Sequence, residues 1–229
     1  MTRVIATMII AVTLLIYPIV GVDAADKHPP ILDSIAGLAW TTEPDYVYTF
    51  EPTVSNHCST TSINEKKGYW LTAAHCVTYR GADPNVPWES VTEDHDYQIN
   101  SHPVRLVFVD VRKDLAVVQT EGYGVKAIKV SKTAPTYEDE ITIAGYPLGW
   151  ARPAITKGRV SSPDQDLKWL SPFLIFQCPI APGSSGSSVL NKKGQIVSVV
   201  QIGWGTSFSA MGGGSTYQNL KEFVTSYLP

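Results

Sequence analysis

The 229-residue chain is poor in charge and in sulfur. Charged side chains make up 17% of the residues, the formal net charge is −3, and there are three cysteines and three methionines. The sequence has no run of like charge and no basic patch, which argues against nucleic acid as a partner. It also has no internal repeat and no low-complexity tract, which excludes repeat architectures and compositionally biased linkers.

Three cysteines cannot all pair within one chain, so a disulfide-rich scaffold is excluded. Cys58 and Cys76 flank one apolar run and could meet across it. Closing that loop would contribute about 3 kcal/mol in the chain-entropy model. Cys178 lies in a predicted strand that leads into a serine-rich turn. There we expect a buried, unpaired thiol, because free cysteine is commonly buried.

The N-terminal segment differs from the rest of the chain. Residues 4–22 are uncharged, follow a short basic start and precede small residues. This pattern predicts a secretory signal over residues 1–24, cleaved after Ala24, and then a polar tether over residues 25–34. The apolar run is also long enough to span a bilayer, so a retained anchor with an extracytoplasmic domain stays open. We expect a secreted or periplasmic protein.

Turn-forming and strand-forming residues dominate the remainder. The 17 glycines and 16 prolines, with frequent β-branched and aromatic residues, favour an all-β class. Residues 121–136 contain glycine and proline and separate two β-rich halves of similar size. Apolar residues at helical spacing predict a closing helix within residues 215–228, preceded by a Ser or Thr cap. The apolar runs predict strands that include residues 35–40, 58–63, 69–72, 104–109, 115–118, 140–146, 173–176 and 196–200.

A serine-rich turn at residues 182–190 lies between two of these apolar runs. It is too rich in glycine and serine to fill a core. A tight polar turn held between buried strands is well suited to present a reactive hydroxyl. Of its four serines, only Ser185 has one glycine two residues before it and another immediately after it. Glycine permits such a bend, so Ser185 is the predicted nucleophile.

A serine hydroxyl needs a base to take its proton, and the base needs a group that orients it. His75 lies in residues 69–77, which are predicted to begin as a strand and end as one helical turn. Asp114 directly precedes the strand at residues 115–118. Taken alone, His75 could be a satisfied core histidine and Asp114 a turn residue. Together with Ser185 they complete the set that nucleophilic catalysis requires.

Four short segments resemble known serine protease motifs. Residues 71–76 (LTAAHC) resemble the histidine motif of chymotrypsin-fold proteases, and Cys58 lies where that family has the partner cysteine. Residues 114–118 (DLAVV) and 144–149 (AGYPLG) resemble segments of the HtrA-type bacterial branch. Residues 182–187 (PGSSGS) resemble its serine turn and that of secreted glutamyl endopeptidases. The order His, Asp, Ser differs from that of an α/β-hydrolase esterase.

This resemblance implies a trypsin-like serine peptidase domain over residues 35–229. Its fold would be two six-stranded antiparallel β-barrels, over about residues 35–125 and 137–229, with a C-terminal helix. Ser185 would attack a peptide carbonyl and form an acyl-enzyme, with His75 as the base and Asp114 orienting it. The N–H groups of Gly183 and Ser185 would form the oxyanion hole. The resemblance implies no cofactor and no metal, and a protein or peptide as the substrate.

Two departures from the pancreatic branch carry predictions. Ser184 replaces the acidic residue that pairs with a new N-terminus, so we expect no activation by that mechanism. Gly203 replaces the serine that supports the catalytic aspartate, so Asp114 needs another support. A pocket wall is expected at Ile202, Gly203, Trp204 and Gly205. With no Asp at its base and no His before the tryptophan, it favours an apolar or small side chain over Arg, Lys or Glu.

Three further expectations complete the interpretation. The sequence after the closing helix predicts no PDZ domain. Residues 93–96 (EDHD) are expected to form a solvated acidic loop rather than a cation site, because too few oxygen ligands are evident. The alternative function is a catalytically silent member of the same fold that binds a protein. The complete His, Asp and Ser set argues against that alternative.

Overall fold

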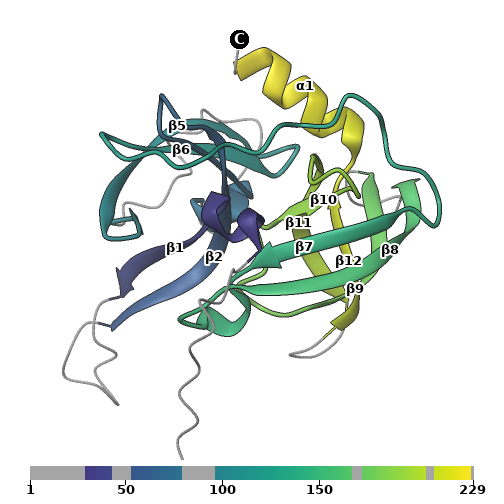
Figure 1. Ribbon diagram of the computed structural model, residues 1–229, viewed down its shortest axis with the longest axis horizontal. Helices are drawn as coiled ribbons and strands as arrows, with labels where there is room; N and C mark the ends of the chain where they lie inside the picture. Colours follow the sequence, from purple (N-terminus) through teal and green to yellow (C-terminus); the bar gives the residue numbers. More distant parts are fainter. Residues whose placement is uncertain (1–28, 43–52, 79–95, 167–171, 205–208, 228–229) are drawn as a thin grey trace, which may run out of the picture.

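Two closed six-stranded antiparallel β-barrels lie side by side (Figure 1). The structure is a computed structural model that describes residues 29–42, 53–78, 96–166, 172–204 and 209–227. The strand order is β1-β2-β3-β6-β5-β4 in the first barrel and β10-β11-β12-β9-β8-β7 in the second. The predicted all-β architecture of two barrels is therefore confirmed.

The first barrel is built on short hydrogen-bonded hairpins around a buried tryptophan. Trp70 is fully buried, and its indole N–H donates to Thr120 Oγ1 at 2.9 Å. The predicted hairpin turn after residue 64 is present. The strands are β1 (Ile35–Thr42), β2 (Thr53–Asn64), β3 (Tyr69–Thr72), β4 (Gln98–Ile99), β5 (His102–Asp110) and β6 (Leu115–Thr120).

The second barrel follows a connection without strands and holds a second apolar core. Buried and exposed residues alternate over residues 176–180 of this barrel, as expected for a strand with one face on the core. Phe176 and Leu174 are fully buried in this core. The strands are β7 (Glu140–Gly145), β8 (Ala154–Gln165), β9 (Phe173–Ile180), β10 (Ser188–Leu190), β11 (Ile196–Trp204) and β12 (Ser209–Ser215).

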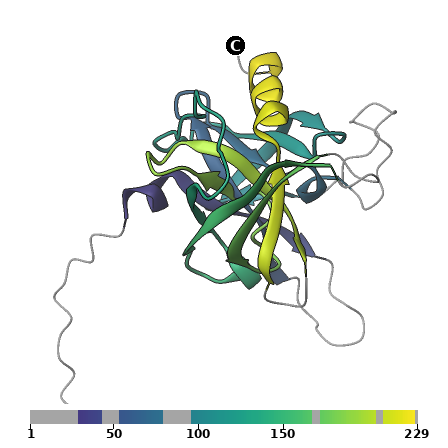
Figure 2. The ribbon, with the colours of Figure 1, turned by 90° about the vertical axis from the view of Figure 1, so that its right-hand side faces the viewer.

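A third apolar cluster joins the two barrels. It combines Leu71 and Val117 of the first barrel with Leu190 and Val199 of the second. The C-terminal helix α1 (Tyr217–Tyr227) adds its buried face to the same cluster. Figure 2 shows that β12 runs almost directly into this helix. The barrels are therefore held together behind the site by a continuous hydrophobic core.

The predicted ends of the chain are partly within the described structure. Thr216 Oγ1 caps α1 by accepting a hydrogen bond from Asn219 N at 3.2 Å, as the sequence predicted. The last residues of the expected tether form a short 3-10 helix, Pro30–Ser34. Among the described segments, none of the helices combines the length and apolarity needed to cross a bilayer. The predicted signal, residues 93–95 and Gly205 lie outside the described residues.

Candidate active site

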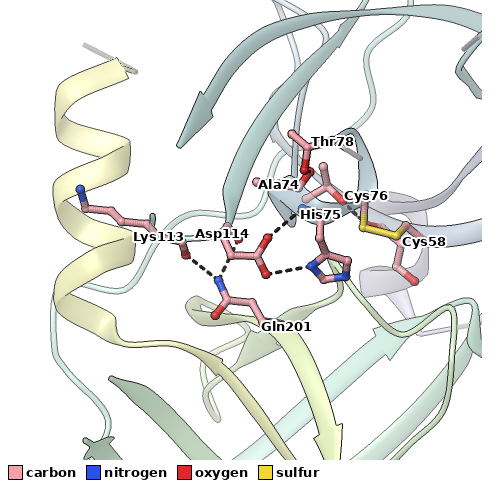
Figure 3. A network of polar contacts seen from close by, with 10 residues as sticks. Cys58, Ala74, His75, Cys76, Thr78, Lys113, Asp114 and Gln201 are labelled. Carbon is pink, nitrogen blue, oxygen red and sulfur yellow. Dashed lines mark hydrogen bonds and ion pairs between the residues drawn. A yellow bond between two sulfur atoms is a disulfide. The ribbon is translucent and has the colours of Figure 1, made fainter. Parts of the chain in front are cut away.

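His75 and Asp114 meet at the edge of the first barrel (Figure 3). The ring Nδ1 of His75 lies 2.8 Å from Asp114 Oδ2, and the backbone N–H of His75 donates to Asp114 Oδ1 at 2.8 Å. Both carboxylate oxygens are thus engaged by one residue. This two-point contact fixes the orientation of the ring, and the contact to the carboxylate favours the tautomer with its proton on Nδ1.

The histidine turn is held rigidly on both sides. His75 lies in a 3-10 turn, Ala74–Cys76, that follows β3 directly, as predicted. Cys76 forms a disulfide with Cys58 of β2, which confirms the expected pairing. Thr78 Oγ1 donates to the Ala74 carbonyl at 3.0 Å on the other side. His75 is therefore carried by a cross-linked turn and not by a free loop.

The electrostatics of the pair favour a charged imidazole. Burial lowers the pKa of His75, but the hydrogen bond and the negative charge of Asp114 raise it by more. The net result is a His75 pKa above its ordinary value of 6.5. The side chain remains 42% exposed by surface area, so it can still reach a substrate.

Asp114 has an unusual backbone conformation. Its φ of +50° lies in the left-handed region that non-glycine residues seldom adopt. Gln201 of β11 supports this turn, because its Nε2 donates to the carbonyls of Lys113 and Asp114 at 2.7 and 2.8 Å. Sequence reasoning missed Gln201. The sequence offered only an indirect indication: Gly203 stands where the pancreatic branch has a serine that supports the aspartate, so Asp114 needed another support.

The serine turn is anchored to the first barrel by its backbone. Ser59 N donates to the Ser185 carbonyl at 2.7 Å, and Ser59 Oγ donates to the Gly183 carbonyl at 2.8 Å. Ser59 Oγ also accepts from Tyr146 N at 2.9 Å. Gly186 lies so close that a Cβ would come within 2.2 Å of Thr72 Oγ1. Ser59 was not among the predicted site residues. It directly follows Cys58, whose disulfide with Cys76 reaches the histidine turn.

The four serines of the turn differ in how far their side chains are exposed to solvent. Ser184, Ser187 and Ser188 are 6%, 0% and 2% exposed, whereas Ser185 is only partly buried. Ser185 Oγ makes no hydrogen bond within the described part of the chain. His75 Nδ1 contacts Asp114, and no hydrogen bond joins Ser185 Oγ to His75 among the described residues.

Two amides of the turn are directed away from internal partners. Gly183 has a φ of +89°, and the Pro182 carbonyl before it accepts from Leu148 N at 2.5 Å. The peptide is trans, so the Gly183 N–H points opposite to that carbonyl. Neither Gly183 N–H nor Ser185 N–H donates to an acceptor among the described residues. Two such donors could together receive a negative oxygen.

A trypsin-like peptidase domain matches residues 58–199 of this chain. The chain belongs to the trypsin-like peptidase family. The match runs from within β2 to within β11 and includes His75, Asp114 and the serine turn, while Gln201 lies just beyond it. The predicted family is confirmed.

Curated relatives point to one branch of these peptidases. A probable periplasmic serine endoprotease DegP-like of Pseudomonas putida (strain GB-1) is 30% identical over 140 residues, which is 60% of this chain and 27% of that protein. Protease Do-like 2, chloroplastic, of Arabidopsis thaliana is 27% identical over 69% of this chain and 26% of its own length. The chain thus spans about a quarter of the length of these relatives.

Solved structures support the same fold. The HtrA-type protease AlgW with decapeptide superimposes with a TM-score of 0.67 at 17% identity, covering 86% of this chain and 65% of that one. The Rv3671c protease from M. tuberculosis, active form, gives a TM-score of 0.63 at 13% identity over 86% and 82% of the two chains. Together with the DegP-like relatives, these matches confirm the resemblance to HtrA-type peptidases.

Three of the residues predicted to form a pocket wall, Ile202, Gly203 and Trp204, lie on β11. Ile202 is half-buried, whereas Gly203 and Trp204 are exposed. A Cβ on Gly213 of β12 would come within 2.8 Å of the Trp204 ring. A Cβ on Gly212 would come within 2.4 Å of Ile180 Cδ1, so that side chain already occupies the space beside β12.

One cluster near the histidine has metal-binding atoms. Ligand atoms of Cys58, His75 and Cys76 lie within 4.8 Å of one another. The two sulfurs are joined in a disulfide and cannot serve as thiolate ligands. In this oxidised peptidase the cluster positions the histidine turn.

Cys178 is a free, buried thiol whose Sγ lies 3.2 Å from Thr156 Oγ1, and burial raises its pKa.

Proposed function

We propose that this peptidase is a secreted or periplasmic serine endopeptidase that uses His75, Asp114 and Ser185 as its catalytic triad. The main support is the bidentate contact between His75 and Asp114, together with a serine turn that packs against Thr72, just before the histidine turn, and has one accessible serine. The disulfide adds support for an oxidising compartment. The DegP-like relatives are periplasmic by name.

In the proposed acylation, Ser185 Oγ attacks the carbonyl carbon of the scissile peptide. The Nε2 atom of His75 takes the hydroxyl proton and later gives it to the leaving amine. Asp114 keeps the ring oriented and stabilises its charged form, which agrees with the raised pKa of His75. Water then hydrolyses the acyl-enzyme by the same proton path in reverse.

The negative oxygen of the tetrahedral intermediate is assigned to Gly183 N–H and Ser185 N–H. Support comes from the hydrogen bond between Leu148 N and the Pro182 carbonyl, which leaves the Gly183 amide directed away. In acyl-transfer enzymes, loss of one such donor costs about 10²- to 10³-fold in kcat.

The substrate is proposed to be a protein or peptide with a small aliphatic residue before the scissile bond. Ile180 Cδ1 lies beside Gly212, which pairs with Gly203, so this side chain limits the space next to Ile202, Gly203 and Trp204, three of the four predicted wall residues. Profiling with a peptide library should show this preference, and Ile180→Ala should extend it to larger apolar residues. A dominant preference for Arg, Lys or Glu would contradict this assignment.

Fluorophosphonate labelling tests the central proposal. The secreted wild-type protein should label on Ser185, as located by peptide mass analysis. His75→Ala and Ser185→Ala should abolish labelling, while Ser184→Ala should retain it, because Ser184 is buried. Correctly folded wild-type protein that does not label would instead favour the catalytically silent binding module.

A further inference from the structure

Gln201 is placed by an irregularity in the second barrel. In the pairing of β11 with β12, Val200 lies opposite Gly214 and Ile202 lies opposite Gly213. Gln201 is therefore the extra residue of a β-bulge. A bulge bends the strand and turns its side chain in a new direction, and bulges are frequent beside functional sites.

The redirected side chain reaches across to the first barrel. Figure 3 shows the Gln201 amide beside the Asp114 turn. Its Nε2 donates to the Lys113 carbonyl at 2.7 Å and to the Asp114 carbonyl at 2.8 Å. A primary amide has two N–H donors, so both are used here. A single side chain of β11 thus donates hydrogen bonds to two successive carbonyls of the first barrel.

The conformation of Asp114 explains why these two carbonyls need donors. With a φ of +50°, Asp114 is left-handed, and its carbonyl and that of Lys113 turn toward the same side. Such a conformation persists only where surrounding contacts determine it. The remaining local contact, from Asp114 N to the Val111 carbonyl, is long at 3.3 Å. Gln201 therefore makes the shortest contacts that define this backbone.

We infer that Gln201 is a positioning residue that holds the Asp114 backbone so that its carboxylate aligns with His75. The inference rests on the proposed function of the triad. Because Gln201 belongs to the second barrel, it also makes the alignment of the first-barrel pair depend on how the two barrels meet. The neutral amide does this without adding a charge that would compete for the Asp114 carboxylate.

The charged groups of Lys113 and Asp110 do not replace this contact. The Lys113 ammonium pairs with Asp110 Oδ2 at 3.0 Å, and Lys113 N donates to Asp110 Oδ1 at 3.0 Å. These contacts close the turn upon itself. They do not involve the Asp114 carbonyl, so the hydrogen bond from Gln201 to that carbonyl is not duplicated by Lys113.

The matched test is Gln201→Met against Gln119→Met. Gln119, near the end of β6 opposite to Asp114, donates from Nε2 to the Lys67 carbonyl at 2.7 Å, which is the same kind of contact outside the proposed triad. Methionine preserves much of the volume and removes the donor. In ¹⁵N-histidine NMR of the full chain, on a Ser185→Ala background that prevents self-cleavage, the Nδ1 proton of His75 should appear strongly downfield.

Gln201→Met should weaken or shift that resonance and bring the His75 pKa down toward 6.5, while Gln119→Met should leave both unchanged. With Ser185 restored, kcat should fall by up to about 10²-fold with KM little changed.

If Gln201→Met fails to fold, Gln201→Asn withdraws the amide with less disturbance. An unchanged resonance and His75 pKa would overturn the inference. Because NMR needs no turnover, an inactive wild-type protein would contradict only the proposed function.

Discussion

At the scale of single residues, the site depends on how each polar atom is partnered. Asp114 uses both carboxylate oxygens on His75, and its backbone is held by Gln201. Ser185 is the accessible serine in a turn whose other serines are buried. These contacts assign separate roles to residues of the same chemical type.

Asp114→Asn should reduce kcat by roughly 10⁴-fold, the loss seen for this change in chymotrypsin-fold proteases. The reason is that the amide NH2 can donate to Nδ1 of His75, which favours the tautomer with its proton on Nε2, so that Nε2 cannot take the serine proton. Steady-state kinetics would measure the loss, and a thermal melt would verify the fold. Asp110→Asn, which changes the neighbouring acid outside the triad, should retain most of the activity.

The pH dependence of activity should reflect the raised pKa of His75. The base must be neutral, so kcat/KM should fall as pH drops through a value above 6.5. For stability the sign is opposite, because protonated His75 gains from Asp114. That contribution is complete below the unfolded pKa and is lost as pH rises through the folded one. An acid limb centred below 6.5 would contradict the assignment.

At the scale of elements, short turns carry the residues of the proposed triad, and strands hold these turns in place. The serine turn precedes β10, the histidine turn follows β3 and Asp114 precedes β6. Each turn is held in place by a different feature. The histidine turn is held by a disulfide, the Asp114 turn by a glutamine from another strand, and the serine turn contains glycines with positive φ. Substitutions of these residues should therefore lower the activity by more than their effect on folding stability explains.

Gly183→Ala should lower kcat by about 10²- to 10³-fold, as expected for a lost oxyanion donor. A Cβ on Gly183 would come within 2.5 Å of the Tyr146 carbonyl, so the turn must shift. Gly194→Ala is the control. Gly194 also has a positive φ, of +68°, but a Cβ there meets nothing within 4 Å. Equal losses of kcat in both variants would show that backbone strain alone is responsible.

Removing the disulfide with Cys58→Ala and Cys76→Ala should lower the free energy of unfolding by about 3 kcal/mol, since the linked residues are 18 apart. Denaturant titration would measure the change. Reductant should destabilise the wild type to a similar extent and leave the double variant unchanged. If reductant also destabilised the double variant, the buried Cys178 thiol would have to be reconsidered.

At the scale of the whole molecule, the site exists because two barrels and one helix share a core. Leu71 of the first barrel and Val199 of the second pack in the same cluster as Phe223 of α1. The serine turn and the pair of His75 and Asp114 come from different barrels. Their separation is therefore set by this interface.

Phe223→Ala should destabilise the fold by about 3–5 kcal/mol, because the side chain is fully buried. The helix seals the contact between barrels, so activity should be lost at a lower denaturant concentration than in the wild type. Lys221→Ala, on the exposed side of α1, should behave like wild type in the same titration. Retention of wild-type stability in Phe223→Ala would show that the helix does not close the interface.

Much of the architecture was predictable from local patterns. Apolar runs and glycine-containing turns predicted the strand from Ile35, the hairpin after residue 64 and the capped C-terminal helix, because these depend on neighbouring residues. The short strand β4, the strands β8 and β12 and the 3-10 helix at Pro30–Ser34 were not among the predicted elements. Two residues are too few to show a period, and segments rich in proline or glycine, or without alternating apolar residues, give no clear strand signal.

The sequence by itself determined the residue types available for chemistry and the turns that carry them, since glycine spacing, apolar runs and caps act over a few residues. It could not reveal the support of Asp114 by Gln201, 87 residues away, or the anchoring of the serine turn by Ser59. Those contacts depend on a bulge in β11 and on the packing of two barrels. Only the tertiary structure decided them, because such long-range directions are set by register and packing and leave no local pattern in the chain.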